Sequence, residues 1–178
     1  SFIKVLNNSV QRACDAPGGS SMNTSECITM ASVNTFEVAN NTVFDRLVDL
    51  NNGGEGIDAK NACVNGKVHH NIVYDMIRVG MYIDSYKSLL NNVEFYSNTV
   101  YNCSSGLNVA CEEGGTNKNV KVYNNVIYNC SKVGIRLAGY LSDGAMNDIS
   151  VYNNTVYNCG FSGGSWENCG LLVEANNV

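Results

Sequence analysis

The sequence is short of several residue types. Among 178 residues it has one Pro, one Trp and two His, and only 15% of its residues are charged. It has no run of 18 apolar residues, so a membrane-spanning helix is not predicted. One Pro and little charge argue against a disordered chain. A net charge of −5 makes nucleic acid and anionic membrane surfaces poor partners.

The eight cysteines do not follow a metal-binding or redox pattern. No C-x-x-C pair occurs, which disfavours a structural zinc site or a thioredoxin-like motif. The only histidines, His69 and His70, are adjacent and expected on opposite faces of a strand, where they could not easily share a metal. Cys14 and Cys27 flank a loop and are candidates for one disulfide. The pairing of three other cysteines is left open: Cys63, Cys111 and Cys169.

Asparagine and glycine are abundant instead, with 28 and 17 residues. Val, Ile, Thr and Tyr together outnumber the helix formers Ala, Leu, Glu and Lys. Residues with branched or aromatic side chains favour strands, and Asn and Gly favour tight turns. The composition therefore predicts an all-β protein with many turns.

A repeat of about 27 to 33 residues runs through the chain, marked by six asparagines: Asn8, Asn41, Asn71, Asn98, Asn125 and Asn154. The residue three positions before each anchor and the residue two positions after it are apolar in all six copies. A further segment, usually opening with Gly, follows each anchor and alternates apolar and variable positions, as in Gly134-Ile-Arg-Leu137. Alternation with period two is typical of strands with one buried face.

Each copy thus contains three short strands separated by turns. Repeats of this length predict a solenoid, because each repeat buries its apolar face only by stacking on its neighbours. We expect residues 1–178 to form a single domain, a right-handed parallel β-helix of about six rungs with three short parallel sheets. The anchor Asn, or the polar residue before it, is predicted to form an internal ladder at one turn; the sequence leaves both rows open.

Other side chains recur at fixed positions of the repeat. Cys103, Cys130 and Cys159 share one position with Met76, and a small apolar column is the simpler explanation. Two aromatic rows should point outward, where they stabilise the sheet or pack on a neighbour. The rows are Phe44, Tyr74, Tyr101, Tyr128, Tyr157 and His69, Tyr96, Tyr123, Tyr152.

Both ends lack a recognisable cap. The chain starts at Ser1 rather than Met, enters a strand at once, and residues 176–178 begin another copy of the repeat. Open solenoid ends favour either a longer native protein or self-association end to end. The Tyr-rich flank is a second candidate for self-association.

The Gly-opened strands place a polar patch on their outward face, in the middle copies. The first row reads Thr29, Asp58, Tyr82, Asn108, Arg136, Leu172, and the second reads Ala31, Lys60, Asp84, Ala110, Ala138, Glu174. We expect Lys60 beside Asp84, and Asp58 beside Tyr82. Rigid strands suit a functional site, so this face is predicted to be an exposed groove. The simpler alternative is a surface ladder of salt bridges, which contributes little stability.

The best copies, V-Y-N-N-V-I-Y-N-C from Val122 and V-Y-N-N-T-V-Y-N-C from Val151, resemble the right-handed β-helix superfamily of pectate-lyase-like proteins. The resemblance covers the whole chain and implies the fold more strongly than the function, because lyases, epimerases, glycosidases, tailspikes and adhesins share that fold. It implies a substrate groove along the same sheet. Residues 55–60, E-G-I-D-A-K, are similar to the acidic segments of some calcium-dependent lyases. The G-H-G segment of polygalacturonases and the D-P-H of mannuronan epimerases are absent.

This resemblance implies a secreted or cell-surface protein that binds or acts on an acidic polysaccharide, by β-elimination of the lyase or C5-epimerase type. The implied base is Lys60 or Arg136, with Tyr82 as the proton donor. Substrate contacts are expected from Asn108, Arg78 and Trp166. A calcium ion is expected on Asp58, Asp84 and Glu55. The alternative is a non-catalytic structural β-helix, such as an adhesin, a tailspike shaft or a filament subunit.

Overall fold

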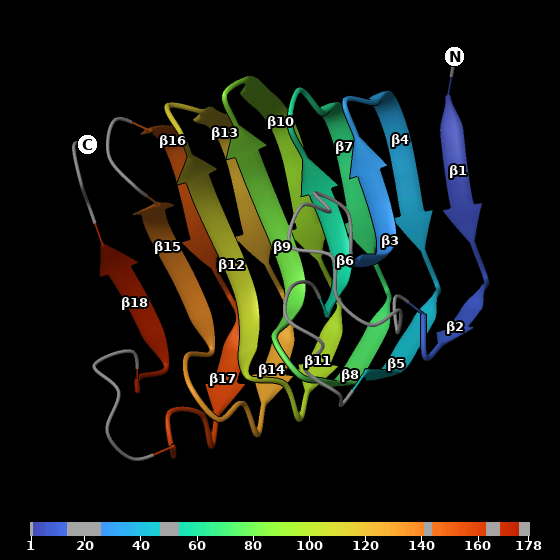
Figure 1. Cartoon of the computed structure of the whole chain (residues 1–178), viewed down its shortest axis with the longest axis vertical. Coiled ribbons are helices and arrows are strands. Elements are labelled where there is room, and N and C mark those ends of the chain that lie inside the picture. Colours follow the sequence, from blue (N-terminus) through green and yellow to red (C-terminus); the bar gives the residue numbers. More distant parts are fainter. Residues whose placement is uncertain (1, 14–25, 47–53, 141–143, 163–167, 175–178) are drawn as a thin grey trace.

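The computed structural model describes residues 2–13, 26–46, 54–140, 144–162 and 168–174, and these residues form eighteen strands. Every pairing between strands is parallel. Figure 1 shows the strands following one another along the molecule, from β1 to β18. In the described ranges no helix is long and apolar enough to cross a membrane.

The strands form three sheets of six strands each. Sheet A contains β1 (Ile3–Leu6), β4 (Asn34–Ala39), β7 (Val64–His69), β10 (Leu89–Tyr96), β13 (Thr116–Tyr123) and β16 (Ala145–Tyr152). Sheet B contains β2 (Ser9–Gln11), β5 (Thr42–Arg46), β8 (Ile72–Met76), β11 (Thr99–Tyr101), β14 (Val126–Tyr128) and β17 (Thr155–Tyr157). Sheet C contains β3 (Glu26–Ala31), β6 (Glu55–Lys60), β9 (Val79–Tyr86), β12 (Ser105–Glu112), β15 (Ile135–Tyr140) and β18 (Leu171–Glu174).

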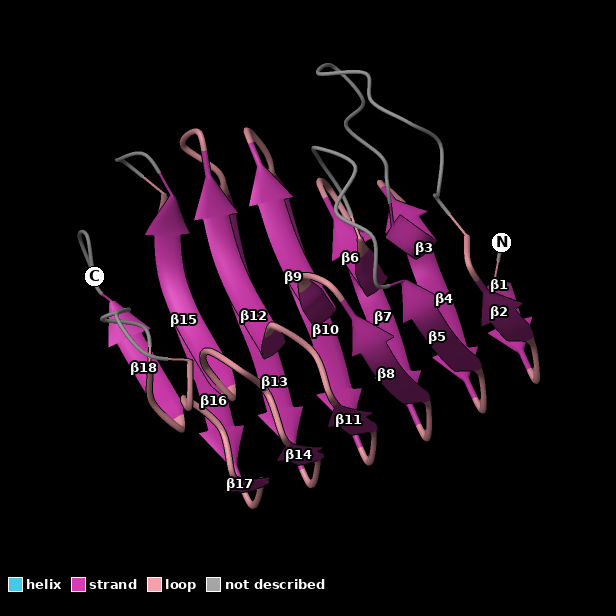
Figure 2. Ribbon diagram, turned by 60° about the horizontal axis from the view of Figure 1, so that its bottom comes forward, coloured by secondary structure: helices cyan, strands magenta, loops and turns pink. Residues whose placement is uncertain are grey.

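Successive strands visit the sheets in the order A, B, C, so each set of three is one rung (Figure 2). This confirms the parallel β-helix that the repeat predicts. The predicted apolar column is confirmed in the four middle rungs, because Val38, Val68, Phe95 and Val122 are paired in register and fully buried. Val5 and Val151 continue the register at the two ends but are only partly buried. Stacked rungs about 4.8 Å apart bury such columns continuously along the axis.

The anchor row, rather than the row before it, is the internal ladder. The amide nitrogen of each of the first five anchors donates to the amide oxygen of the next anchor, as from Asn98 to Asn125 at 3.0 Å. The same nitrogen donates to a backbone carbonyl of the preceding rung, and the amide oxygen also accepts from a backbone N–H. Every interior ladder amide therefore satisfies both its donors and its acceptor while buried.

The row before the anchors has a different role, which is to make the turn. Its residues adopt positive φ values between 53° and 59°: Asn7, Asn40, His70, Ser97, Asn124 and Asn153. Asn tolerates this left-handed conformation better than most residues. Further left-handed positions recur elsewhere in the rungs, including Asn65 and Asn92 in sheet A. These positions explain much of the asparagine content of the sequence.

The glycine at the start of four sheet C strands is required by space: Gly56, Gly80, Gly106 and Gly134. A Cβ added to Gly106 would lie 2.4 Å from Ile127 Cγ2 and 2.5 Å from the carbonyl oxygen of Gly134. Gly56, Gly80 and Gly134 face the equivalent valines of the following rung. The repeated glycine therefore lets these four sheet C strands approach the apolar column of sheet B.

The aromatic and sulfur rows behave largely as predicted. Tyr101 stacks between Tyr74 and Tyr128 at centroid distances of 4.8 and 4.9 Å. In the second row, Tyr96 stacks between His69 and Tyr123. Three members of the sulfur column are buried in the core: Met76, Cys103 and Cys130. Neither of these two cysteines forms a disulfide. Cys14 lies outside the described residues, so its pairing with Cys27 stays a prediction.

The expectation for the two histidines is wrong. His69 Nδ1 and His70 Nδ1 lie 2.8 Å apart, so the rings meet instead of pointing to opposite faces. The cause is the backbone of His70, whose φ of 56° ends the strand alternation. His69 Nε2 also contacts Glu37 Oε1 at 3.2 Å.

Candidate functional site

Sheet C brings together most of the predicted site residues. The register places Asp58 beside Tyr82, Tyr82 beside Asn108, and Asn108 beside Arg136. Lys60 stands beside Asp84, as predicted. We call these six residues the sheet C cluster: Asp58, Lys60, Tyr82, Asp84, Asn108 and Arg136.

The expected exposure of this cluster is wrong. Asp58 is 0% exposed, Asp84 3%, and Lys60 and Arg136 8% each. The long side chains bend onto their neighbours and cover them, instead of extending into solvent. Substitutions of Lys60 or Arg136 therefore cannot be assumed to leave stability unchanged.

The two cations of the cluster are held by carboxylates. Lys60 Nζ lies 2.7 Å from Glu26 Oε1 and 3.1 Å from Asp58 Oδ2. Arg136 Nη2 lies 2.7 Å from Glu174 Oε2. The pKa of Lys60 is raised because its neighbouring carboxylates outweigh the effect of burial. Lys60 therefore keeps its proton, which suits binding of an anionic group better than action as a base.

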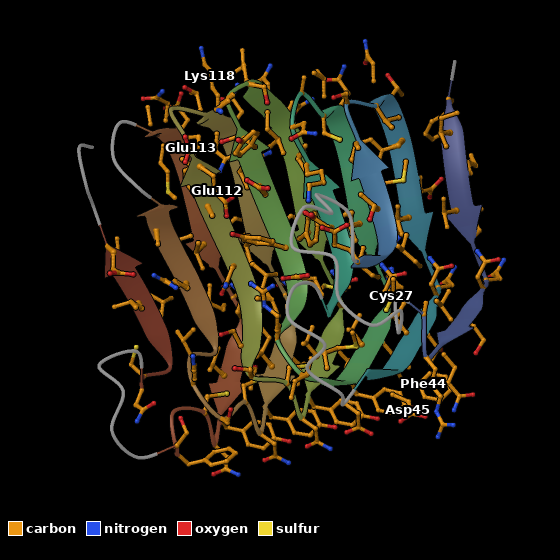
Figure 3. All side chains as sticks on the ribbon, in the orientation of Figure 1. Cys27, Phe44, Asp45, Glu112, Glu113 and Lys118 are labelled. Atoms are coloured by element: carbon orange, nitrogen blue, oxygen red, sulfur yellow. The ribbon has the colours of Figure 1, made fainter. Side chains whose placement is uncertain are left out.

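Tyr82 connects the cluster to the end of β12. Its hydroxyl donates to Glu112 Oε1 at 2.5 Å. Both residues are half-buried, so they form the most accessible part of the cluster. Figure 3 shows Glu112 and Glu113 together at this end of the sheet. Burial, followed by the charge of Glu112, raises the pKa of Tyr82 well above its ordinary value.

The carboxylates of Asp58 and Asp84 are incompletely satisfied. Both oxygens of Asp58 and Oδ1 of Asp84 are buried and have no hydrogen-bond partner in the described part of the chain, although Asp58 has its ion pair with Lys60. Burial, the largest cause, and the charge of Glu112 raise the pKa of Asp84 to about 7. Burial likewise raises the pKa of Asp58. A neutral or half-ionised buried acid of this kind is typical of functional sites.

The remaining predicted residues do not join the cluster equally. Glu55 Oε1 pairs with Arg78 Nη1 at 3.3 Å, at the edge where the Arg78 side chain is 47% exposed. Trp166 lies outside the described residues. Among the residues that the structure describes, no three His, Cys, Asp or Glu side chains gather into a group that could hold a metal ion. The predicted calcium ligands fit the ion poorly, because Glu55 and Asp58 are engaged by cations.

The sequence-based list omitted Glu26, which holds Lys60 in place. Glu26 pairs in register with Glu55, so a glutamate occurs before the Gly position in two successive copies. That recurrence was the signal that could have identified it.

Comparison with known proteins gives a family match to part of the chain and a distant structural likeness. Residues 117–177 match a protein family described as "Disaggregatase related"; this segment contains Arg136 and Glu174 but not Asp58, Lys60 or Tyr82. No curated protein matches the chain. A similar solved structure is the enzymatically active domain of tailspike protein 2 from bacteriophage CBA120, 11% identical, with a TM-score of 0.41. The match covers 99% of this chain and 39% of that one, so the chain spans about two fifths of the tailspike domain's length.

Proposed function

We propose that the chain is a carbohydrate-active β-helix protein that binds an acidic polysaccharide at the sheet C cluster and cleaves or epimerises it. The observation that carries this proposal is the pair of buried, poorly satisfied carboxylates, Asp58 and Asp84, beside held cations and a tyrosine–glutamate pair. Leaving buried polar groups without partners costs stability, so their presence on one face favours a role in chemistry over a role in folding.

The residues divide into two kinds by charge. Lys60 and Arg136 would neutralise the carboxylate of a uronic acid, which lowers the pKa of the adjacent C5 proton. In β-elimination the electrons of the C5–H bond form the C4–C5 double bond, the C4–O4 bond breaks, and O4 takes a proton. Asp84 is the proposed proton acceptor, in place of Lys60, and Tyr82 the donor to O4, with Glu112 as the partner that replenishes its proton.

Access is through the half-buried end of the cluster. Tyr82 and Glu112 are half-buried and are the proposed first point of contact with the polymer, whereas Asp84 is almost fully buried. No step is derived through calcium; a requirement for it stays a prediction, checked by adding a chelator. Activity on an extracellular polymer would place the protein outside the cell or at its surface.

A panel of pectins, alginates and glycosaminoglycans tests the proposal, with unsaturated-uronate absorbance as the readout. Tyr82→Phe should lower turnover by about 100-fold or more. Tyr101→Phe is the matched control, because this tyrosine stacks in sheet B, away from the cluster. Equal activity of both variants would contradict the assigned role of Tyr82. Binding without cleavage would reduce the protein to a binding module.

A non-catalytic structural β-helix is the second candidate. The observation that favours it is the pairing of both cluster cations within the chain, Lys60 with Glu26 and Arg136 with Glu174. Absence of both binding and cleavage across the panel would favour this alternative.

A further inference from the structure

The outward face of sheet A carries a row of alternating charges, one per rung. The register pairs five of them in succession: Lys4, Glu37, Lys67, Glu94 and Lys121. Lys4 Nζ lies 3.1 Å from Glu37 Oε2, and Lys121 Nζ lies 3.3 Å from Glu94 Oε1. The outer lysines thus use the two glutamates, and the row has one positive charge left over.

That unbalanced charge is Lys67, in the middle of the row. Glu37 also contacts His69, and Glu94 accepts the hydroxyl of Tyr123 at 3.0 Å. No ion pair forms on Lys67 within the described ranges, and its side chain is exposed. An ammonium between two occupied carboxylates is available to one external anion.

Lys67 lines a pocket of about 380 Å³ on this face. The pocket also includes Phe2, Gly66, Asn65 and Asn92. Asn92 Nδ2 donates to Asn65 Oδ1 at 2.7 Å, which fixes the amide of this exposed residue and leaves its Oδ1 as an acceptor for an external donor. Phe2 adds an aromatic ring that is 54% exposed. Cation, amide acceptor and aromatic ring together are the groups that recognise a charged sugar.

We propose that this pocket is a second carbohydrate site, which binds one uronic-acid unit. The sugar carboxylate would pair with Lys67, its hydroxyls would donate to Asn92 Oδ1 and the flanking glutamates, and its apolar face would lie against Phe2. The volume lies within the usual range for small-ligand pockets. Glu37 and Glu94 repel a doubly charged phosphate. The site lies on a different sheet from the cluster, so it does not depend on catalysis there.

The test is a titration of the chain with glucuronate and galacturonate, followed by the backbone amide NMR signals of Gly66 and Asn92. Lys67→Met should weaken binding roughly ten- to hundredfold, since it removes a charge-assisted contact. Lys118→Met is the matched control, because Lys118 is an exposed lysine of sheet A that does not line the pocket. Asn92→Asp, which adds a third carboxylate, should also weaken binding.

Three results would overturn the proposal. One is unchanged affinity in both Lys67→Met and Asn92→Asp; another is saturation without movement of the Gly66 and Asn92 signals. The third is equal affinity for acetate, which would make the pocket a site for any small anion. Asp84→Asn should leave uronate binding here unchanged while abolishing turnover, so failure of one proposal is distinguishable from failure of the other.

Discussion

At the scale of single residues, neighbouring asparagines have opposite tasks. Asn125 is buried and makes ladder hydrogen bonds along the axis, whereas Asn124 is exposed and supplies the left-handed turn. Both belong to the same N-N pair in the repeat. Position relative to the turn, and not residue type, decides which contribution each makes.

Asn125→Ala should lower the free energy of unfolding by about 3 kcal/mol or more. The change removes the donor to Phe95 O and the acceptor of the backbone N–H of Asn98, and it breaks one hydrogen bond of each neighbouring ladder amide. Urea unfolding measures this change in the free energy of unfolding. Asn124→Gly is the control and should stay within about 1 kcal/mol of the parent, because Gly adopts positive φ readily. Similar losses in both variants would argue against the division of tasks.

Asp84 should make stability depend on pH. Its pKa is raised from 3.8 to about 7 in the folded chain, so between these values the folded chain holds a proton that the unfolded chain has lost. Stability therefore falls as pH rises from about 4 to about 7, by at most about 4 kcal/mol from this group. Asp84→Asn should raise the melting temperature at pH 8 and change it little at pH 4. A gain of equal size at both pH values would contradict the assignment of this pH dependence to Asp84.

At the scale of strands, Phe36 and Gly66 share one space in the core. They pair in register on β4 and β7, and a Cβ on Gly66 would lie 2.1 Å from the tip of the Phe36 ring. The next rung has Val93 at this position. The large side chain of Phe36 in one rung thus occupies the space that the glycine leaves in the next rung.

Gly66→Val alone should destabilise the fold by about 1–3 kcal/mol through overpacking. Phe36→Val alone should destabilise it by about 2 kcal/mol through the cavity that it leaves. The double variant restores the volume and should be more stable than the sum of the single losses indicates. Additive losses in denaturant unfolding would mean that the two side chains do not compete for this space.

The sequence predicts the strands and their register well, because these depend on local alternation and on the spacing of Asn and Gly. It predicts the contacts on the outer faces poorly. Lys60 reaches Glu26 in the preceding rung, and Tyr82 reaches Glu112 beyond its direct neighbour Asn108. Long side chains can choose among several partners, so their burial depends on packing that no repeat encodes. The predicted direction of the His70 ring is wrong because the positive φ of His70 ends the alternation of the strand.

At the scale of the whole molecule, the last rung exposes apolar residues. On β18, Leu171 is 51% exposed and Val173 59%. Unpaired strand edges with exposed apolar side chains promote association. The 178-residue chain should therefore show a concentration-dependent mass in light scattering. Leu171→Lys with Val173→Lys should reduce that mass, whereas Val126→Lys, on the outer face of sheet B, should not. A monomeric parent chain at all concentrations would contradict this expectation.

The asparagine ladder also gives the solenoid a direction. Each amide N–H points toward the next rung, from Asn8 to Asn41 and onward to Asn154, so the amide dipoles all align. Aligned dipoles leave partial positive charge at one end of the row and partial negative charge at the other, as they do in a helix. A second molecule can therefore continue the row only head to tail. Contact between two N-terminal ends would set the acceptor Asn8 Oδ1 against its copy, and contact between two C-terminal ends would set the donor Asn154 Nδ2 against its copy.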